Sequence, residues 1–589
     1  MNVREHLAGG APLLFDGAMG TYFASLPGRS EARCELGDLD HPEEIAAIHR
    51  AYLEAGCRAI RTNTFDVGAD LSRDAGEARR IIEAGCRLAL AAAEPYGAFV
   101  FADLGPAARE GAASPGEIYC RQADIFIDRG LDHFVVETLP TDEGVPELAR
   151  YLKERCPSAF LLVSFAVGPD GTTREGLPGR ALFRRTAALD GVDAVGFNCM
   201  SGPRHLLEFV RGLDLSVLDG KALSVMPNAG YPTVLGRRVA YQGEPDYFAA
   251  RLADAVGEGA AIVGGCCGTR PRHIACAAAA LEGLSPRPAA VPARPRREPE
   301  VRPGRNRLRD ELASGRRAIA VELDPPTDDD ASAFMEGVRA LRDAGADAIT
   351  IADCPVGRPR ADSSLLACKI RRETGVEPLP HLTCRDRNLN ATKALLLGLS
   401  MEGVHNVLLV TGDPVPTQDR DEVKSVFNFN SRKLIRYVSG LTGQGLSVPF
   451  QIFGALNVNA ANFAKQLELA SEKEACGAAG FLTQPVHSPQ ALENLELARK
   501  TLKGKILGGV FPIVSHRNAL FLNNEVAGMR VPEEIVRLYE GKGREEAEEL
   551  AVALSVRAAR AMEPYTDGWY LMTPFRRVAL IVRIMEELR

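Results

Sequence analysis

The chain has 589 residues, a formal net charge of −7 and a hydrophobic fraction of 46%. This composition is typical of globular protein, and the length predicts two domains of barrel size or several smaller ones. The negative charge argues against a nucleic-acid surface, and no apolar run approaches the ~18 residues of a membrane span. The first residues lack the apolar segment of a signal peptide, and 13 scattered cysteines do not form a disulfide framework, so we expect a cytoplasmic protein.

Short apolar segments alternate with amphipathic stretches throughout the first half. Eight of them read as strands: 13–16, 60–64, 100–103, 135–138, 162–165, 196–199, 224–228 and 263–267. Stretches rich in Ala, Leu, Glu and Arg lie between them, such as 42–55 and 247–256, and favour helices. Apolar strands separated by helices indicate a parallel sheet that is buried on both faces.

A segment rich in proline and arginine, 285–307, divides the chain into halves of nearly equal length. Proline lacks a backbone donor and charged side chains resist burial, so we expect an extended, solvated linker. The sequence therefore predicts one domain over 1–284 and a second over 308–589.

The second half repeats the pattern of the first. Its eight predicted strands are 319–323, 348–353, 379–384, 407–413, 450–454, 480–484, 507–512 and 569–573. Eight strand–helix units in each half predict an α/β chain of two closed (β/α)8 TIM barrels. An open doubly wound sheet is the alternative, but neither half has a Gly-x-Gly-x-x-Gly turn after its first strand.

Three cysteines lie at the ends of two predicted strands in the first half. Cys199 closes one apolar run, and Cys266 and Cys267 lie in the run Gly-Gly-Cys-Cys-Gly-Thr. One strand separates these two in a barrel, so their carboxyl ends lie within a metal's reach. Three thiolates suit a tetrahedral Zn²⁺ that keeps its fourth position for a substrate. Taken alone, the Cys-Cys pair would more often be two packed small side chains.

The first half resembles the homocysteine S-methyltransferase family in several motifs, in order. They are Asp16-Gly-Ala-Met-Gly-Thr21, Thr62-Asn-Thr-Phe65, Glu137-Thr138, Gly196-Phe-Asn-Cys199 and Gly264-Gly-Cys-Cys-Gly-Thr269. The resemblance implies Zn²⁺ on the three cysteines, with Asp16 and Glu137 binding the amino acid end of homocysteine. We expect Asn63 to bind substrate too, although an Asn at a strand end often ties down a loop. For Asp16 and Glu137 the alternative is a cap or a salt bridge.

Polar residues also end the strands of the second half, where they resemble methylenetetrahydrofolate reductase. The motifs are Glu322 before Pro325-Pro326, His381-Leu-Thr-Cys384, Thr411-Gly-Asp-Pro414 and Thr483-Gln-Pro485, within a likeness that covers most of 315–580. The family implies FAD bound without a dinucleotide fingerprint, and NAD(P)H as the electron donor. Two positions depart from the family: Thr411 stands where Arg is common, and Ala352 where a flavin-contacting Thr is expected.

The resemblance also implies roles for single residues of the second half. Glu322 would protonate a ring nitrogen of methylenetetrahydrofolate, Gln484 would hold the folate, and Asp413 would lie beside the flavin and contact the pterin. His381, Thr383 and Lys473 are the other expected cofactor-binding residues. A carboxylic acid serves near neutral pH only when its pKa is raised, and we expect Asp413 to face Glu322 and supply the like charge.

Together the halves predict a bifunctional enzyme of one-carbon metabolism that methylates homocysteine to methionine and reduces methylenetetrahydrofolate. The alternative is a folate reductase whose first barrel senses homocysteine or S-adenosylmethionine without turnover. The methyl of methyltetrahydrofolate sits on a poor leaving group, and the sequence contains no Asp-x-His-x-x-Gly cobalamin segment. We therefore expect a sulfonium donor or a separate cobalamin protein as donor partner. The sequence leaves the oligomeric state open, a homo-oligomer included.

Overall fold

The computed structural model describes residues 2–30, 32–68, 71, 74–107, 113–235, 238–241, 243–286, 304–415, 423–442, 445–525 and 530–589. The chain divides into two compact units, Met1–Arg297 and Glu298–Arg589. Each unit has its own large hydrophobic core. The linker over 285–307 and the domain limits at 284 and 308 stay predictions, because 287–303 lie outside the described residues.

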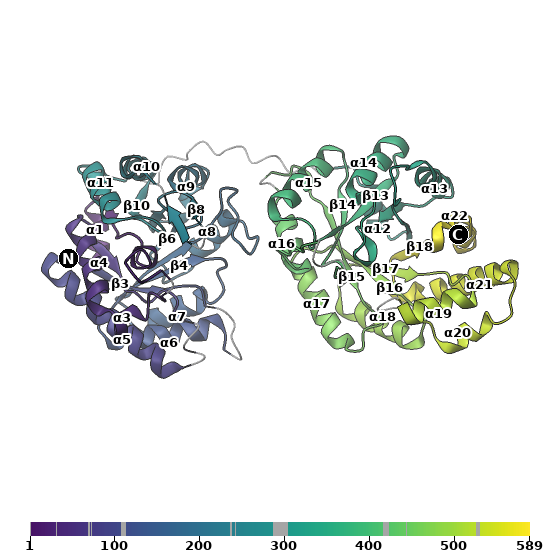
Figure 1. Cartoon of the computed structure of the whole chain (residues 1–589), viewed down its shortest axis with the longest axis horizontal. Coiled ribbons are helices and arrows are strands. Elements are labelled where there is room, and N and C mark those ends of the chain that lie inside the picture. The colour runs from purple at the N-terminus through teal and green to yellow at the C-terminus, as the bar shows by residue number, and fades with distance from the viewer. Residues whose placement is uncertain are drawn as a thin grey trace. The chain divides into compact units, whose positions relative to one another are not determined.

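The first unit contains eight parallel strands surrounded by helices (Figure 1). In spatial order they are β1 (Leu13–Leu14), β10 (Ala260–Val263), β7 (Ala222–Met226), β6 (Ala194–Asn198), β5 (Phe160–Phe165), β4 (His133–Leu139), β3 (Phe99–Leu104) and β2 (Ala59–Arg61). A parallel bridge between Phe15 and Ala59 joins the two ends of this sheet, so the ring is nearly closed. The eight predicted strands are confirmed, each within a few residues.

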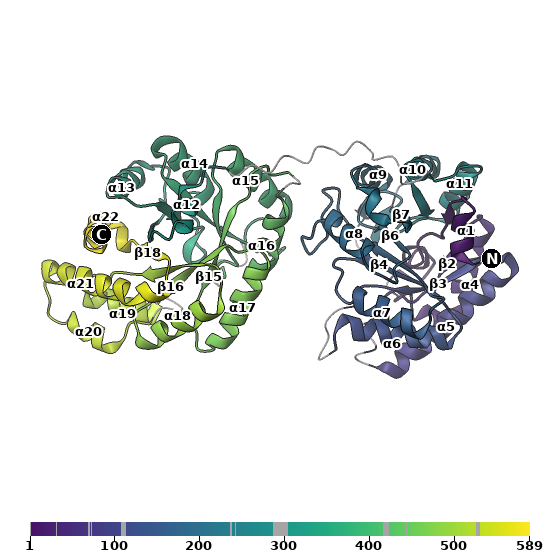
Figure 2. The same cartoon turned by 180° about the vertical axis from the view of Figure 1, so that it is seen from behind.

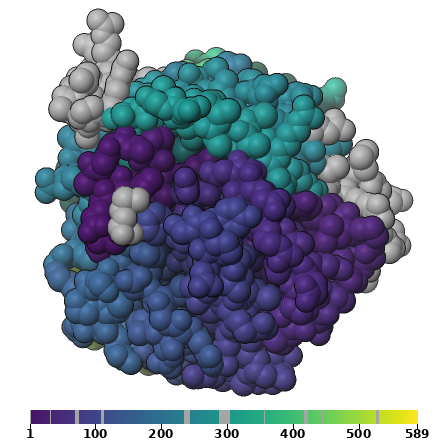
Figure 3. Space-filling model, turned by 90° about the vertical axis from the view of Figure 1, so that its left-hand side faces the viewer, coloured from purple at the N-terminus to yellow at the C-terminus, as the bar shows by residue number. Residues whose placement is uncertain are grey.

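Eleven helices among the described residues accompany these strands. They are α1 (Val3–Ala8), α2 (Gly20–Phe23), α3 (Gly37–Asp40), α4 (Pro42–Glu54), α5 (Ala75–Ala93), α6 (Pro115–Asp128), α7 (Val145–Arg155), α8 (Gly179–Ala187), α9 (Pro203–Val210), α10 (Pro245–Gly257) and α11 (Pro271–Leu281). Figure 3 shows the purple surface of the first helices adjoining the teal surface near the end of the unit, where α4 contacts α11. The beginning and the end of the unit therefore meet, as a ring of strands requires.

A short antiparallel hairpin, which the sequence analysis did not predict, follows β7. Its strands are β8 (Pro232–Leu235) and β9 (Arg238–Tyr241). The hairpin lies outside the parallel sheet and brings Tyr241 against Gly268, just after the cysteine pair.

The second unit is a closed barrel of eight parallel strands, also covered by helices (Figure 2). In ring order the strands are β11 (Ala318–Leu323), β12 (Ala348–Ile351), β13 (Glu377–Thr383), β14 (Asn406–Val410), β15 (Gln451–Leu456), β16 (Gly480–Pro485), β17 (Lys505–Val510) and β18 (Gly568–Met572). The ring closes between β18 and β11. The prediction of two (β/α)8 barrels is confirmed.

The helices of the second unit follow the same alternation, with additional helices before β11 and between β17 and β18. They are α12 (Arg307–Ala313), α13 (Ser332–Asp343), α14 (Ser363–Thr374), α15 (Leu389–Met401), α16 (Ser431–Gly440), α17 (Phe463–Ala475), α18 (Pro489–Thr501), α19 (His516–Glu525), α20 (Glu533–Leu538), α21 (Arg544–Met562) and α22 (Val578–Leu588). No helix in the described parts of the chain is long and apolar enough to cross a membrane.

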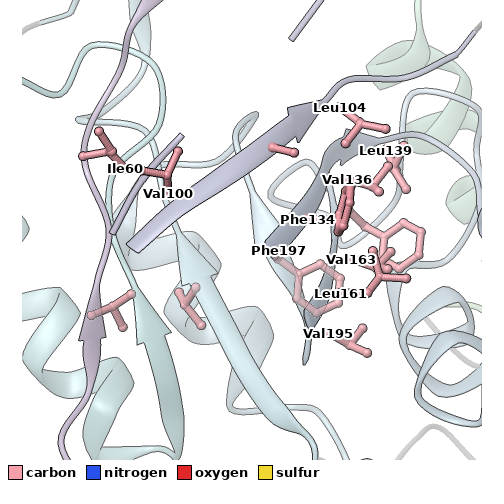
Figure 4. Packing of buried hydrophobic residues seen from close by; sticks show 14 of the residues in the cluster. Ile60, Val100, Leu104, Phe134, Val136, Leu139, Leu161, Val163, Val195 and Phe197 are labelled. Atoms are coloured by element: carbon pink, nitrogen blue, oxygen red, sulfur yellow. The ribbon is translucent and has the colours of Figure 1, made fainter. Parts of the chain in front are cut away.

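Side chains of the strands alternate between two apolar layers. Figure 4 shows Phe134 and Val136 of β4 packed with Leu161 and Val163 of β5, in the layer between strands and helices. The intervening Val135 belongs instead to the interior of the ring, with residues such as Phe101 of β3. Each side chain fully buried in this way contributes about 1.5–3 kcal/mol. Because both faces are apolar, polar side chains are placed at the strand ends.

Candidate active sites at the two barrel mouths

The structure brings the three predicted cysteines of the first unit together. The Sγ atoms of Cys199, Cys266 and Cys267 all lie within 4.8 Å of one another, and those of Cys199 and Cys267 are 3.7 Å apart. Cys199 follows β6, and the cysteine pair follows β10, so the cluster stands at the carboxyl-terminal rim of the barrel. Strand β10 ends at Val263, which places the pair in the loop after the strand and not within it.

The structure around the cysteine pair leaves no room for a side chain at Gly265 or Gly268. A Cβ on Gly265 would lie 2.5 Å from Oγ1 of Thr269, and one on Gly268 would lie 2.2 Å from the ring of Tyr241. Gly268 also has a φ of +80°. Cys199 itself adopts a φ of +56°, a left-handed conformation that costs an L-residue about 1–3 kcal/mol. Such strain is retained where a side chain has to point in a particular direction.

The thiols of the cluster are poor acids as they stand. The hydrogen bond with Cys199, together with burial, holds the pKa of Cys266 well above its usual value. A divalent cation reverses this preference, because only the thiolate is a good metal ligand. Three soft sulfur donors at this spacing, with no protein carboxylate among them, fit Zn²⁺ with one open position. The donor set therefore suits the metal that the sequence implies.

A buried arginine lies next to the cluster and holds both carboxylates that the sequence pointed to. Nε of Arg61 donates to Oδ1 of Asp16 at 2.9 Å, and Nη1 donates to Oε2 of Glu137 at 2.9 Å. Nη2 donates to the carbonyl of Gly265, in the loop that carries Cys266. All three ionic side chains are buried, with residue exposures of 7% for Arg61, 2% for Asp16 and 6% for Glu137. The structure therefore shows the salt-bridge alternative for both carboxylates, and their substrate-binding role stays a prediction.

Asn198 links this network to the thiols. Its Nδ2 donates to Oε2 of Glu137 at 2.8 Å and lies 3.7 Å from Sγ of Cys266. Asn63 points elsewhere: its Nδ2 donates to the carbonyl of Cys34 at 2.7 Å and to Asp38 at 3.0 Å. These contacts match the expectation that an Asn in this position ties down a loop, and its substrate-binding role stays a prediction.

Glu322 stands at the mouth of the second barrel, near the end of β11. The hydroxyl of Tyr570, on β18, donates a hydrogen bond to its carboxylate. Burial raises the pKa of Glu322 to about 7, while the hydrogen bond from Tyr570 opposes the rise and the charge of Asp324 adds to it. The like charge thus comes from Asp324, and not from Asp413 as we expected, because Asp413 lies in an exposed segment after β14.

His381 completes the surroundings of Glu322. Its Nε2 lies 3.7 Å from Oε2 of Glu322 and has no hydrogen-bond partner among the described residues. Burial lowers the pKa of His381 to about 4, so the ring is neutral at pH 7. The pair is therefore a neutral imidazole beside a carboxyl group that is half protonated near neutrality.

Two further expected cofactor residues line the same rim. Oγ1 of Thr383 donates to Asp353 at 3.0 Å, and Asp353 in turn pairs with Arg387 at 2.9 Å. Nζ of Lys473, on α17, donates to the carbonyl of Ala455. Burial lowers the pKa of this lysine to about 8. Thr383 thus stands at the end of β13, whereas Lys473 reaches β15 from helix α17.

Asp413 and Gln484 lie farther around the mouth. Gln484 is on β16 and is partly exposed. The carbonyl of Asp413 accepts a hydrogen bond from Nη1 of the buried Arg385 at 2.6 Å. Gly412, at a φ of +92°, lets this segment approach Thr383, where a Cβ would lie 2.9 Å away. A rim with a close backbone approach, an unpartnered imidazole nitrogen and a buried lysine fits a large polar cofactor such as FAD.

Sequence reasoning missed several polar groups of the two mouths. In the first, these are Arg61, Asn198 and Tyr241, whose hydroxyl shares a hydrogen bond with Cys267. In the second, they are Tyr570 and Arg385. The alternation of in-facing and out-facing residues gave a signal for Arg61, since a charged residue at an in-facing position needs a partner.

The fold and its two mouths define a pair of (β/α)8-barrel domains, one with a buried thiol cluster and the other with a carboxyl group that titrates near neutrality. Each barrel matches a known protein family. Residues 13–281 match the homocysteine S-methyltransferase family, and residues 307–588 match the methylenetetrahydrofolate reductase family. The chain therefore has an N-terminal homocysteine S-methyltransferase domain and a C-terminal methylenetetrahydrofolate reductase domain.

Two methionine synthases each match a little under half of the chain. Methionine synthase of Mycobacterium leprae is 32% identical over 308 residues, and that of Mycobacterium tuberculosis is 31% identical over 300 residues. Each match covers 46% of this chain and about a quarter of the relative, 25% and 24% respectively. Among solved structures, the metallated form of the homocysteine methyltransferase MmuM from Escherichia coli is 24% identical, with a TM-score of 0.39. That match covers 47% of this chain and 99% of the other.

Proposed function

We propose that the chain is a bifunctional enzyme. Its first domain transfers a methyl group to the sulfur of homocysteine with the help of Zn²⁺, giving methionine. Its second domain reduces 5,10-methylenetetrahydrofolate to 5-methyltetrahydrofolate with FAD and an NAD(P)H donor. The observation that carries the first activity is the meeting of three thiols, distant in sequence, beside a buried ionic network at one barrel mouth. The similarity to two methionine synthases supports methionine as the product.

In the first domain, Cys199, Cys266 and Cys267 would hold the metal. A Zn²⁺ bound by three thiolates supplies a Lewis acid that ionises an incoming thiol at neutral pH. Asp16 and Glu137 would bind the amino acid end of homocysteine while Arg61 keeps both carboxylates in place. The substrate sulfur then attacks the methyl carbon in line, so that the new carbon–sulfur bond forms as the bond to the donor breaks. This step needs a donor with a good leaving group.

In the second domain, Glu322 would be the general acid. With a pKa of about 7 it retains a proton for a ring nitrogen of methylenetetrahydrofolate, whose five-membered ring then opens to an electrophilic iminium. FAD, when bound and reduced, would supply the hydride that converts the iminium to a methyl group. Tyr570 orients the Glu322 carboxyl, Gln484 and Asp413 would contact the folate, and His381, Thr383 and Lys473 would contact the cofactor.

The methyl donor for homocysteine is an external molecule in this proposal. A sulfonium compound carries a methyl on a good leaving group, and a separate cobalamin protein would deliver an equally reactive methyl. The tertiary amine of methyltetrahydrofolate is a far poorer leaving group, so direct transfer between the two domains is not part of the proposal.

Metal analysis, a visible spectrum and two assays of the purified chain test the proposal together. We expect one zinc per chain, a yellow chromophore, NAD(P)H-dependent reduction of methylenetetrahydrofolate, and methionine from homocysteine and S-methylmethionine or methylcobalamin. A chain that binds zinc and homocysteine yet forms no methionine with any donor would instead support the sensing alternative. A colourless chain that does not bind added FAD would overturn the proposal for the second domain.

A further inference from the structure

A third acidic residue stands in the mouth of the first barrel, and neither the motifs nor the mechanism above uses it. Asp103 lies near the end of β3, between Arg61 on β2 and Glu137 on β4. These three residues follow Ala59, Phe101 and Val135 by two positions, and those three belong to the interior of the ring. Because strand side chains alternate, Arg61, Asp103 and Glu137 face the same interior, as one layer at the open end.

The backbone of Asp103 is fixed by the neighbouring strand. Its N–H donates to Oγ1 of Thr62 at 2.9 Å, and its carbonyl accepts from Oγ1 of Thr64 at 2.8 Å. Its side chain is different: only 5% of the residue is exposed, and Oδ1 has no hydrogen-bond partner among the described residues. A buried carboxylate oxygen without a partner is destabilising, because nothing replaces the hydrogen bonds that it makes with water in the unfolded chain. An oxygen without a partner in a proposed binding site can accept a hydrogen bond from a ligand.

Each oxygen of the other two carboxylates already accepts a hydrogen bond. Oδ2 of Asp16 accepts from the backbone N–H of Arg61 and Oδ1 accepts from its Nε. Both oxygens of Glu137 accept from Nη1 of Arg61, and Oε2 also accepts from Asn198. Three carboxyl groups therefore surround one guanidinium, and the group with an open acceptor is Asp103. Burial, followed by the charge of Glu137, raises the pKa of Asp103.

We propose that Asp103 is the specificity residue that accepts a hydrogen bond from the α-ammonium group of the substrate, with Glu137 next to it. This inference rests on the proposed function and deepens it: the first domain selects amino acid thiols over simple thiols. Arg61 then acts as a positioning residue, which holds Asp16 and Glu137 in place beside Asp103.

An ammonium group suits this position better than a second metal ion. A divalent cation needs several open oxygen ligands, whereas in this layer a single carboxylate, that of Asp103, has a buried oxygen without a partner among the described residues. An ammonium group has three donors and one charge. With Arg61 it would give two cations for three carboxylates, where the guanidinium alone gives one.

The test compares homocysteine with 4-sulfanylbutanoate, which has the same thiol and carboxylate but no amino group. Binding of each to the zinc-loaded full chain is measured by calorimetry for wild type, Asp103→Asn and Asp190→Asn, an exposed matched control. We expect Asp103→Asn to raise the Kd of homocysteine at least tenfold and to change that of the analogue by less than threefold. Asp190→Asn should change neither, and zinc should remain at one per chain in all three.

Other outcomes overturn the inference. If Asp103→Asn weakens both thiols equally, or neither, Asp103 does not recognise the amino group, although the methyl-transfer proposal survives. If wild type binds neither thiol, the proposed function fails as well. Two zinc ions per wild-type chain and one in Asp103→Asn would make the residue a metal ligand. Asp103→Ser, which removes the carboxylate without introducing an amide, gives the same readout should the Asn variant not fold.

Discussion

The hydroxyl of Tyr570 donates a hydrogen bond to the carboxylate of Glu322, although 248 positions separate the two residues in the chain. They are neighbours because β18 closes the second ring against β11, where Glu322 pairs in register with Met572. The hydrogen bond stabilises the charged form of Glu322 and thereby limits the rise in its pKa that burial causes. The closing strand of the barrel thus sets the acidity of the proposed acid.

This relationship predicts the pH dependence of the reductase. A general acid works in its protonated form, so activity should fall as the pH rises through about 7, the pKa of Glu322. In Tyr570→Phe the stabilising hydrogen bond is lost, the pKa rises further, and the falling limb should move to higher pH. Steady-state rates over pH 5.5–9.5 measure the falling limb of wild type and of Tyr570→Phe, with Tyr565→Phe as the control. Glu322→Gln should lower turnover by about 10²–10⁴-fold at every pH. Identical profiles for Tyr570→Phe and wild type would contradict the prediction.

Replacing one cysteine should separate the two activities. Cys199→Ala removes one of the three proposed zinc ligands, so we expect less than one zinc per chain and a loss of methionine formation of at least 100-fold. The reductase should be unaffected, because the second domain has its own core. Cys276→Ala, on α11 and outside the thiol cluster, should retain zinc and both activities. Methionine formation that persists in zinc-free Cys199→Ala would refute the metal role.

Removing the central guanidinium should destabilise the first domain. Arg61→Met leaves the buried carboxylates of Asp16 and Glu137 unpaired, which typically costs about 3–5 kcal/mol. Arg61→Lys should recover part of this loss, because it keeps the charge but not the fork that spans both carboxylates. Calorimetric unfolding measures the effect, and the transition of the first domain is the one that shifts when Zn²⁺ is added. An Arg61→Met chain that unfolds at the wild-type temperature would show that the network contributes little.

A methyl group on Gly265 should displace the loop that carries two of the proposed zinc ligands. Its Cβ would lie 2.5 Å from Oγ1 of Thr269, so the loop has to move and carry Cys266 with it. We expect Gly265→Ala to weaken zinc binding at least tenfold in competition with a chelator. Gly257→Ala is the matched control, since no heavy atom lies within 4 Å of a Cβ built there. Equal zinc affinity for the two variants would mean that the loop adapts freely.

The architecture could be predicted from the sequence because a parallel barrel has a strong local signal. Each strand is buried on both faces, so it reads as a short apolar run, and each ends at polar residues that mark the rim. This signal was enough to find all sixteen strands of the two rings and to place Cys199 and the Cys266–Cys267 pair at one mouth. The hairpin of β8 and β9 was missed because it lies outside this repeating pattern.

The partners of the site residues could not be predicted in the same way. Whether Glu322 faces Asp413 or Tyr570 depends on how the loop after β14 folds back, and no local pattern reports this. Asp103 lies in a predicted strand, but its importance comes from an unsatisfied oxygen, which only the arrangement of Arg61 and Glu137 reveals.

The first ring joins its earliest strand, β1, to its latest, β10, through pairs such as Leu13 with Ile262. During synthesis the sheet therefore stays open until residues near 263 have emerged, and only then can this long-range pairing form. The same segment carries Cys266 and Cys267 directly behind it. Binding of the proposed zinc ion and closure of the ring would thus occur late and together, so zinc uptake would report how far this domain has folded.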